Sequence, residues 1–291
     1  MRRIPIMCAV VVLTGCGSAG LSSGGTTVPA PTSTAASTTV STSPSTTDEP
    51  ATTAINPVDE PSTAIYLLSN GVLHVVGRSL GASDPVSVMQ ALVAGPASVE
   101  LGAGISSALP PDAKVLGVSV EGSTAHVNLS ADVAEGAEGD LTMRAAQVVY
   151  TLTALPGIHT VEFAFDGVVN VGFGRPELNV HPLGREQFTD GVLPLILLET
   201  PLPYAKVSGE PLVLSGTAST FEATVNYKVL DPHGTLLVEG VTMATCGTGC
   251  WGTFHQSVAL PAGAVGPFTV QVFDYSSKDG SVVDLQQIVV T

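Results

Sequence analysis

The sequence predicts an α+β domain, with two helices on a sheet, followed by an all-β sandwich. Between residues 63 and 190, apolar runs of strand length alternate with two segments of helical periodicity. From residue 194 the helical spacing disappears, and short β-rich runs recur with turns between them. Because 44% of the 291 residues are hydrophobic and 12% are charged, each region is apolar enough to bury a core.

The strands of the first region are marked by alternation and by turn residues. Asn70-Gly71 lies between two apolar runs and is a strong hairpin signal. Glu121-Gly122 separates a second pair of alternating runs. Five strands are expected, at 64–68, 72–76, 114–120, 124–129 and 160–165.

Two helices are expected between these strands. Asp84-Pro85 supplies an N-cap followed by proline at the first helical position, and Gly95-Pro96 ends that helix. A second helix is predicted from Leu141 to Leu155, with its apolar residues on one face. Residues 97–112 are expected to be a connection. The order predicts two helices on one face of a single sheet.

An ordered set of short motifs accompanies this pattern. Its members are Ala91 to Pro96, Leu109-Pro110, Ala125 to Ser130, Gln147 to Thr153, Pro156 to Ile158, Val161 to Gly167 and Pro182 to Arg185. With this set the first region resembles the GerMN domain, named from sporulation and spore-germination proteins. The resemblance implies a non-catalytic extracytoplasmic domain related to the ring-building modules of envelope assemblies.

The second region shows the pattern of an antiparallel sandwich. Seven strands are expected, at 195–198, 212–216, 223–230, 236–243, 252–259, 268–275 and 281–290. Ser215 to Ala218 and Phe221 to Val225 resemble the immunoglobulin-like domain of bacterial spore germination, as do Thr200 to Pro203 and Ser276 to Ser281. That fold by itself fixes no function.

The N-terminus has the layout of a secretory signal peptide. Met1-Arg2-Arg3 is basic, and the apolar run from Ile4 to Leu13 is too short to span a bilayer as a helix, which needs ~20 residues. Leu13-Thr14-Gly15-Cys16 resembles a bacterial lipobox, which implies that Cys16 carries a diacylglyceryl group and becomes the mature N-terminus. The alternative is an ordinary cleavage nearby that leaves Cys16 free.

These readings give a linear organisation. Residues 1–15 are a predicted signal peptide, 16–62 a lipidated N-terminus with a disordered stalk, 63–190 the GerMN-like domain and 194–291 the immunoglobulin-like domain. The stalk is predicted because residues 17–62 are rich in Ser, Thr, Ala and Pro. Whether the stalk is glycosylated stays open.

The charge of the chain limits its partners. With 25 acidic and 10 basic residues, it carries a formal charge of −15, which disfavours nucleic acid as a partner. An anionic membrane surface does not attract such a chain, so we expect attachment through lipid, for which two acyl chains suffice.

The two cysteines of the second region, Cys246 and Cys250, are expected to form a disulfide, because an even pair in an exported chain favours one. A zinc site needs four ligands, and His255 is merely a third candidate. A redox motif would prefer C-x-x-C before a helix.

The remaining polar residues give weak signals. The histidines lack metal-ligand spacing, and we expect His74 and His126 at the surface of their strands. The acidic stretch 132–140, with Asp132, Glu135, Glu138 and Asp140, is expected to be a solvated loop; Ca²⁺ binding there stays open because the EF-hand order is absent. We expect no cofactor and no resident metal.

Residues 170–192 carry Phe173, Arg175, Arg185 and Phe188. We expect this segment to close the first domain rather than to form a site.

No serine-hydrolase, zinc-protease or nucleotide-binding motif is found in the sequence. We therefore expect a non-enzymatic, lipid-anchored protein on the extracytoplasmic face of the cell membrane. Its domains would contact an envelope protein or further copies of the chain, as a scaffold or accessory of a cell-envelope or sporulation-like assembly. The alternative is a lipoprotein that binds cell-wall glycan or peptide, and a cell-wall enzyme using clustered acids ranks last.

The anchor prediction can be tested at Cys16. Cys16→Ala should shift the protein out of the membrane fraction while both domains stay folded, because it removes the lipidated side chain. Fractionation of cells followed by immunoblotting measures this shift. A variant that stays in the membrane fraction as fully as the wild type would contradict the anchor.

Overall fold

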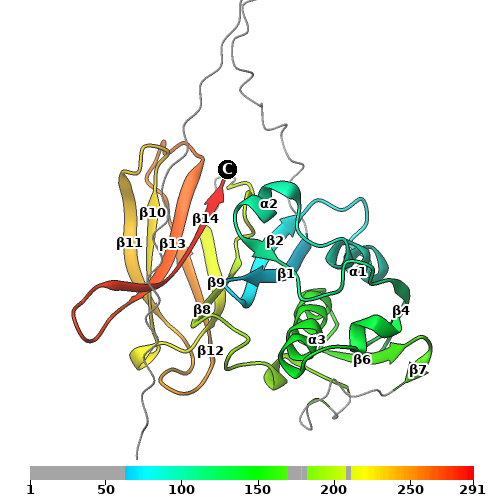
Figure 1. The fold of residues 1–291 in the computed structure, drawn as a ribbon. Coiled ribbons are helices and arrows are strands. Elements are labelled where there is room, and N and C mark those ends of the chain that lie inside the picture. Colours follow the sequence, from blue (N-terminus) through cyan, green and yellow to red (C-terminus); the bar gives the residue numbers. More distant parts are fainter. Residues whose placement is uncertain (1–62, 170–177, 179–181, 208–210) are drawn as a thin grey trace, which may run out of the picture. The chain divides into compact units, whose positions relative to one another are not determined.

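The computed structural model describes residues 63–169, 178, 182–207 and 211–291 (Figure 1). The predicted signal peptide and stalk, including Cys16, lie outside the described residues. The described residues belong to one compact unit. Within the described residues no helix is both long and apolar enough to cross a membrane.

The first region opens with the predicted hairpin. β1 (Thr63–Ser69) and β2 (Val72–Arg78) pair antiparallel from Thr63↔Arg78 to Ser69↔Val72. Asn70 and Gly71 both have positive φ, 53° and 80°, as a two-residue type I′ turn requires. The hairpin prediction is therefore confirmed.

The first helix also begins where it was predicted. α1 (Pro85–Val93) is capped by the Asp84 carboxylate, which accepts hydrogen bonds from the backbone N–H groups of Val86 and Ser87. The Ser87 hydroxyl also donates to this carboxylate, and this bond, with those from the backbone, holds the pKa of Asp84 below its usual range.

The stretch 97–112 contains more structure than a connection. It holds a short helix, α2 (Ser98–Gly102), and a two-residue strand, β3 (Ile105–Ser106). The Glu100 side chain accepts from the Ala97 backbone N–H, which supports the first turn of α2. Elements of this length leave no periodicity to read in a sequence.

The rest of the first region forms a second sheet around a βαβ unit. β4 (Val115–Glu121) and β5 (Thr124–Leu129) are antiparallel, α3 (Glu138–Thr153) follows, and β6 (Thr160–Phe165) pairs parallel with β5. β7 (Val168–Val169) completes the strand order β4-β5-β6-β7. A 3₁₀ turn, η1 (Ala131–Ala134), precedes α3.

The strands thus form two sheets, where the sequence suggested one. The other sheet has the order β2-β1-β3. Helix α1 contacts β1 and β4, and α3 contacts β1 and β6, so both helices touch both sheets. The α+β class is confirmed. The number of sheets was wrong because the local sequence pattern does not show which distant strands pair.

The acidic stretch 132–140 is not one solvated loop. α3 begins at Glu138, so Glu138 and Asp140 lie in its first turn, where acidic side chains complement the helix dipole. The Arg144 guanidinium donates to backbone carbonyls of Asp132, Val133 and Glu135. An arginine of this chain therefore organises the carbonyl oxygens of the stretch.

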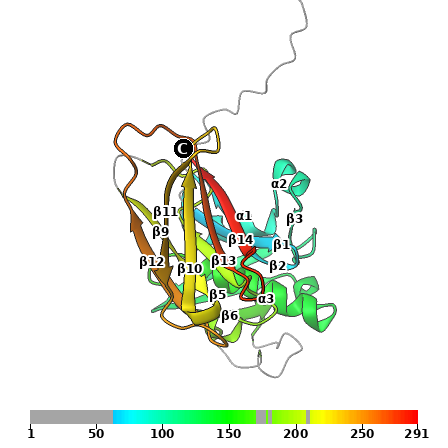
Figure 2. The ribbon, with the colours of Figure 1, turned by 90° about the vertical axis from the view of Figure 1, so that its left-hand side faces the viewer.

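The second region is the predicted sandwich. Its seven strands are β8 (Ile196–Thr200), β9 (Leu212–Ala218), β10 (Thr224–Leu230), β11 (Leu236–Met243), β12 (Gly252–Val258), β13 (Phe268–Tyr275) and β14 (Val282–Val290). One sheet has the order β12-β9-β8 and the other β11-β10-β13-β14, whose strands lie side by side in Figure 2. All seven predicted strands are confirmed.

Two hydrophobic cores correspond to the two regions. The first is built around Leu67, Met89 and Phe163, each fully buried. The second contains Val225 and Val270, both fully buried, which come from the neighbouring strands β10 and β13 of one sheet.

The close contact between β8 and β9 gives a test of the fold. A methyl group at Gly216 would collide with the backbone carbonyl oxygen of Leu197. Gly216→Ala should therefore lower the free energy of unfolding by about 1–3 kcal/mol. Denaturant unfolding followed by circular dichroism measures the change.

The matched control is Gly139→Ala in α3, where an added methyl group meets nothing within 4 Å. Because alanine favours a helix over glycine, this change should stabilise the protein by about 0.5–1 kcal/mol. Equal effects of the two substitutions would show that the β8–β9 contact is described wrongly.

Candidate functional site at the domain junction

Strand β8 belongs to both cores. Ile196 and Leu198 are buried in the second core, whereas Leu197 is buried in the first. Successive side chains of a strand point to opposite faces, so one strand can serve two cores. Glu199 follows two residues after Leu197 and lies on the face directed at the first domain.

Arg185 meets Glu199 from the other side. It begins η3 (Arg185–Gln187), a 3₁₀ turn of the first domain. Its Nη1 lies 2.7 Å from Glu199 Oε1, its Nε donates to Thr153 Oγ1 at 2.7 Å, and its Nη2 donates to the carbonyl of Tyr150 at 3.1 Å. Nη2 also reaches the Tyr66 hydroxyl at 3.3 Å. Every guanidinium nitrogen thus has a partner in the protein.

Two tyrosines enclose this guanidinium. Arg185 Cζ lies 4.5 Å from the ring centre of Tyr150 and 5.4 Å from that of Tyr66, within cation–π range. The Tyr66 hydroxyl donates to Glu199 Oε1. We call Tyr66, Tyr150, Thr153, Arg185 and Glu199 the junction network, because it joins β1, α3, η3 and β8.

Burial shapes the acid–base behaviour of the network. The pKa of Tyr66 is raised well above its ordinary value by burial and by the negative charge of Glu199. Burial also raises the pKa of Tyr150. For Arg185, burial opposes the charged form, but Tyr66 and Glu199 outweigh it and raise the pKa.

These shifts limit the chemistry of the network. Near neutral pH both tyrosines stay protonated and donate hydrogen bonds, so neither acts as a base. Because the pKa of each is raised in the folded protein, their contribution to stability is complete below the ordinary tyrosine pKa of about 10 and is lost as the pH rises through the folded values.

A hollow of about 430 Å³ lies beside the network and is lined by Tyr66, Thr153, Arg185, Glu199 and Ser215 among others. Perturbed titratable groups beside a hollow are the usual sign of an active site, but ion-pair networks perturb pKa values in the same way. Since each guanidinium nitrogen of Arg185 already bonds a group of the protein, we assign the network a structural role.

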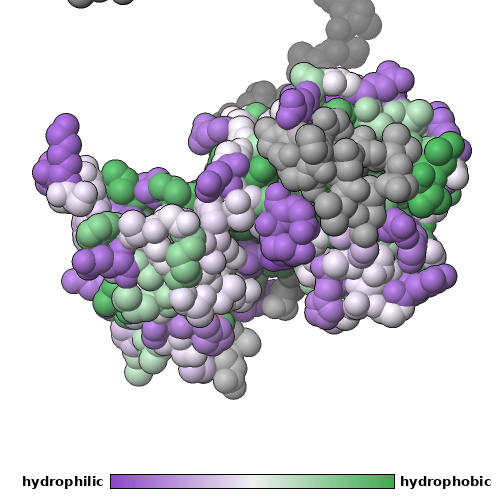
Figure 3. Space-filling model, turned by 90° about the horizontal axis from the view of Figure 1, so that it is seen from below, coloured by the Kyte–Doolittle hydropathy of each residue, from purple (hydrophilic) through white to green (hydrophobic). Residues whose placement is uncertain are grey.

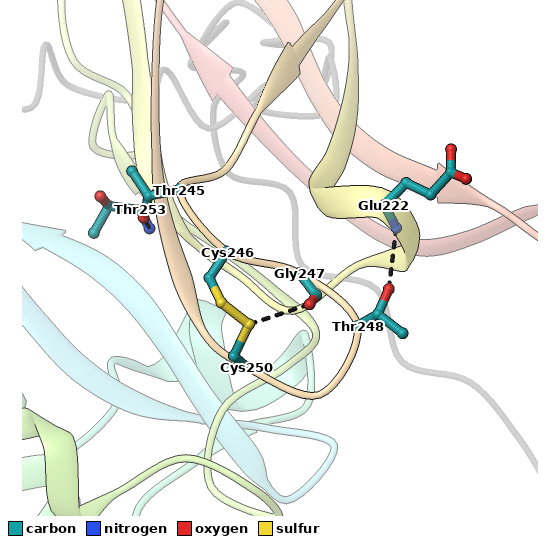
Figure 4. The surroundings of a disulfide bond; sticks show 7 residues. All are labelled: Glu222, Thr245, Cys246, Gly247, Thr248, Cys250 and Thr253. Atoms are coloured by element: carbon teal, nitrogen blue, oxygen red, sulfur yellow. Dashed lines mark hydrogen bonds between the residues drawn. A yellow bond between two sulfur atoms is a disulfide. The ribbon is translucent and has the colours of Figure 1, made fainter.

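The cysteine loop forms a second feature of the junction (Figure 4). The structure joins Cys246 and Cys250 in a disulfide, with Cα atoms 5.8 Å apart. Thr248 Oγ1 accepts from the Glu222 backbone N–H at 3.1 Å, as Figure 4 shows. A side chain at position 247 would collide with the backbone of Ala223, which explains why this position is a glycine, Gly247.

Trp251 follows the disulfide and contacts the first domain. Its indole Nε1 donates to Asp190 Oδ1 at 3.2 Å, and its partly buried ring packs against the first core. His255, the candidate third zinc ligand, lies exposed on β12 opposite Ser215. Over the described ranges, no group of three or more His, Cys, Asp and Glu residues could hold a metal ion.

The other sequence candidates are dispersed. His74 is half-buried on β2, and burial lowers the pKa of its imidazole. His126 is partly exposed on β5, with Nδ1 2.7 Å from Glu162 Oε2. Phe173 and Arg175 lie outside the described residues.

Sequence reasoning missed the importance of Arg185. Together with Phe188 it was expected only to close the first domain, and Phe188 is fully buried as that expectation requires. The signal that existed was an arginine in an apolar segment between two domains. Its partners Tyr66 and Glu199 are 119 and 14 residues away, so no local motif identifies them.

Comparison with family models identifies both domains. Residues 64–170 match the model described as "Sporulation and spore germination", and residues 195–281 match "Immunoglobulin-like domain of bacterial spore germination". The resemblance inferred from the sequence is thereby confirmed for the two domains. No curated protein matches the chain.

Solved structures show weaker similarity. The tandem GerMN domains of the sporulation protein GerM from Bacillus subtilis are 17% identical, with a TM-score of 0.38; the match covers 67% of this chain and 60% of that one. The first GerMN domain of the same protein is 23% identical over 45% of this chain and 96% of that one, with a TM-score of 0.34. A putative lipoprotein from Clostridium perfringens is 19% identical over 42% and 86%, with a TM-score of 0.28. These TM-scores are too low for any of the three structures to assign a role to this chain.

The junction network predicts a cost for losing one hydroxyl. Tyr66→Phe should lower the free energy of unfolding by about 1.5–3 kcal/mol at neutral pH, because it removes a buried hydrogen bond to a charged carboxylate. Chemical denaturation measures this value. Tyr204→Phe, which removes the hydroxyl of a tyrosine that is 53% exposed, is the control and should change little. If Tyr66→Phe leaves the free energy of unfolding unchanged, the junction network does not stabilise the protein.

Proposed function

We propose that this chain, a GerMN domain followed by the immunoglobulin-like domain of bacterial spore germination, is a non-enzymatic accessory protein of the cell envelope. In this proposal it is anchored by lipid on the extracytoplasmic face of the membrane. Its two domains present surfaces to an envelope protein partner or to further copies of the chain, as a scaffold or accessory of a sporulation-like assembly.

The observation that carries the proposal is the succession of two spore-germination domains in one chain. Both family descriptions refer to sporulation or germination, and neither names a catalytic activity. The strongest cluster of perturbed titratable groups is consistent with this, because its guanidinium and the Tyr66 hydroxyl bond Glu199 across the domain junction.

The anchor rests on Leu13-Thr14-Gly15-Cys16 and on the basic, apolar segment before it. The Ser/Thr/Pro-rich residues that follow would separate the folded domains from the membrane. A chain with a formal charge of −15 gains no attraction from anionic lipid headgroups, so in this proposal the acyl chains supply the attachment.

The surface favours a partner that is recognised by both hydrophobic and polar contacts. On the face shown in Figure 3, hydrophobic residues are scattered among hydrophilic ones and do not gather in one large patch. Interfaces of non-obligate complexes are about as apolar as the rest of a protein surface. Such a face suits reversible association with another envelope protein.

The proposal is tested by two measurements on the purified full chain and on intact cells. Incubation with peptidoglycan fragments and with ester substrates should give neither turnover nor saturable binding. Photo-crosslinking in intact cells, from Val99 and from Val265, which are 76% and 77% exposed, should capture a defined envelope protein or a second copy of the chain.

The outcomes separate the candidate functions. Saturable binding of muropeptides would favour the glycan- or peptide-binding alternative, and turnover would show an enzyme. Crosslinked products that are the same from exposed and from buried positions, such as Leu92, would show that the capture is non-specific.

A further inference from the structure

The connection between the two domains is buried. Val192 and Leu193 are 4% and 5% exposed, and both belong to the first core. The Leu73 backbone N–H donates to the Val192 carbonyl at 2.8 Å, which fixes the connection to β2. Flexible linkers between domains are exposed and make few contacts. This segment has the opposite properties.

We propose that the two domains form one rigid body, held at two separate points by the junction network and by the Asp190–Trp251 contact beside the cysteine loop. The inference goes beyond the proposed function, because it depends on neither the lipid anchor nor a partner. It assigns the Cys246–Cys250 disulfide a role between the domains in addition to any role within the sandwich.

The first point is strong because its two charges are paired and partly buried. The side chains of Arg185 and Glu199 are 30% and 20% exposed. Removing one member of such a pair leaves the other charge poorly solvated and unpaired. Separation of the domains would have the same effect, so the network resists opening.

The second point restricts the rotation of the domains. Contact at one point leaves a domain free to rotate in every direction, whereas a second contact limits rotation to the axis through the two points, and apolar packing must oppose what remains. Trp251 supplies this contact from the sandwich, and Asp190 receives it five residues after Arg185. Leu197 adds apolar packing from β8 into the first core.

The cysteine loop sets the position of Trp251. Cys250 precedes Trp251 directly, and a side chain at Gly252 would collide with the backbone of Cys246. The two ends of the loop are therefore close together, and the disulfide closes them. A short closed loop has few conformations, so the indole is directed at Asp190.

The test uses Trp251 as its own reporter, because it is the sole tryptophan of the chain. Glu199→Gln, made in the full chain, removes the charge that Arg185 requires. Loosening of the junction should shift the fluorescence emission to longer wavelength and increase quenching by acrylamide, since the indole gains access to water.

Glu100→Gln is the matched control. Glu100 pairs with Arg78 at 2.6 Å, its side chain is 19% exposed against 20% for Glu199, and both members of the pair lie in the first domain. This variant should leave the emission and the quenching of Trp251 unchanged. A Glu199→Gln protein whose Trp251 signal also stays unchanged overturns the proposal.

A second variant keeps the test decisive if Glu199→Gln does not fold. Asp190→Ala acts at the other point, because it removes the oxygen that accepts from Trp251, and it leaves both cores intact. Increased quenching of Trp251 in this variant, with native circular dichroism, supports the two-point junction. Unchanged quenching overturns it, whatever the result of the anchor and crosslinking experiments.

Discussion

The pairing of the Arg185 guanidinium with Glu199 is the interaction on which the rest of the structure depends. A charge placed at a domain junction must be paired and hydrogen-bonded, or its desolvation opposes folding. Here the requirement is met by groups from four elements, since Thr153, Tyr150 and Tyr66 complete the shell. The same contacts that satisfy the arginine therefore position β1, α3, η3 and β8 relative to one another.

Much of the fold could be read from the sequence, because its strands follow a period of two and its turns use the expected residues. Asn70-Gly71 and Asp84-Pro85 acted as the pattern predicts. The short α2 and the division into two sheets could not be read, since pairing of distant strands leaves no local signal. The junction network could not be predicted from the sequence either. In the sequence Tyr66 resembles an ordinary core tyrosine and Arg185 a surface arginine, and only the fold brings them together.

These contacts shape the functional account. The most perturbed side chains of the described residues belong to the junction, where each guanidinium nitrogen of Arg185 bonds a group of the protein. Both domains belong to spore-germination families. A fixed arrangement of two such domains gives a partner a surface of constant geometry, which lowers the ordering cost of association.

The central claim, that the domains are one rigid body, is tested most directly by the distance between them. Spin labels at Val99 and Val265, both highly exposed, can be introduced in a chain with Cys8 and Cys16 replaced by serine. Pulsed electron paramagnetic resonance then gives the distribution of distances. The account predicts one narrow distribution in the wild-type background that broadens with Glu199→Gln. A broad distribution in the wild-type background would contradict it.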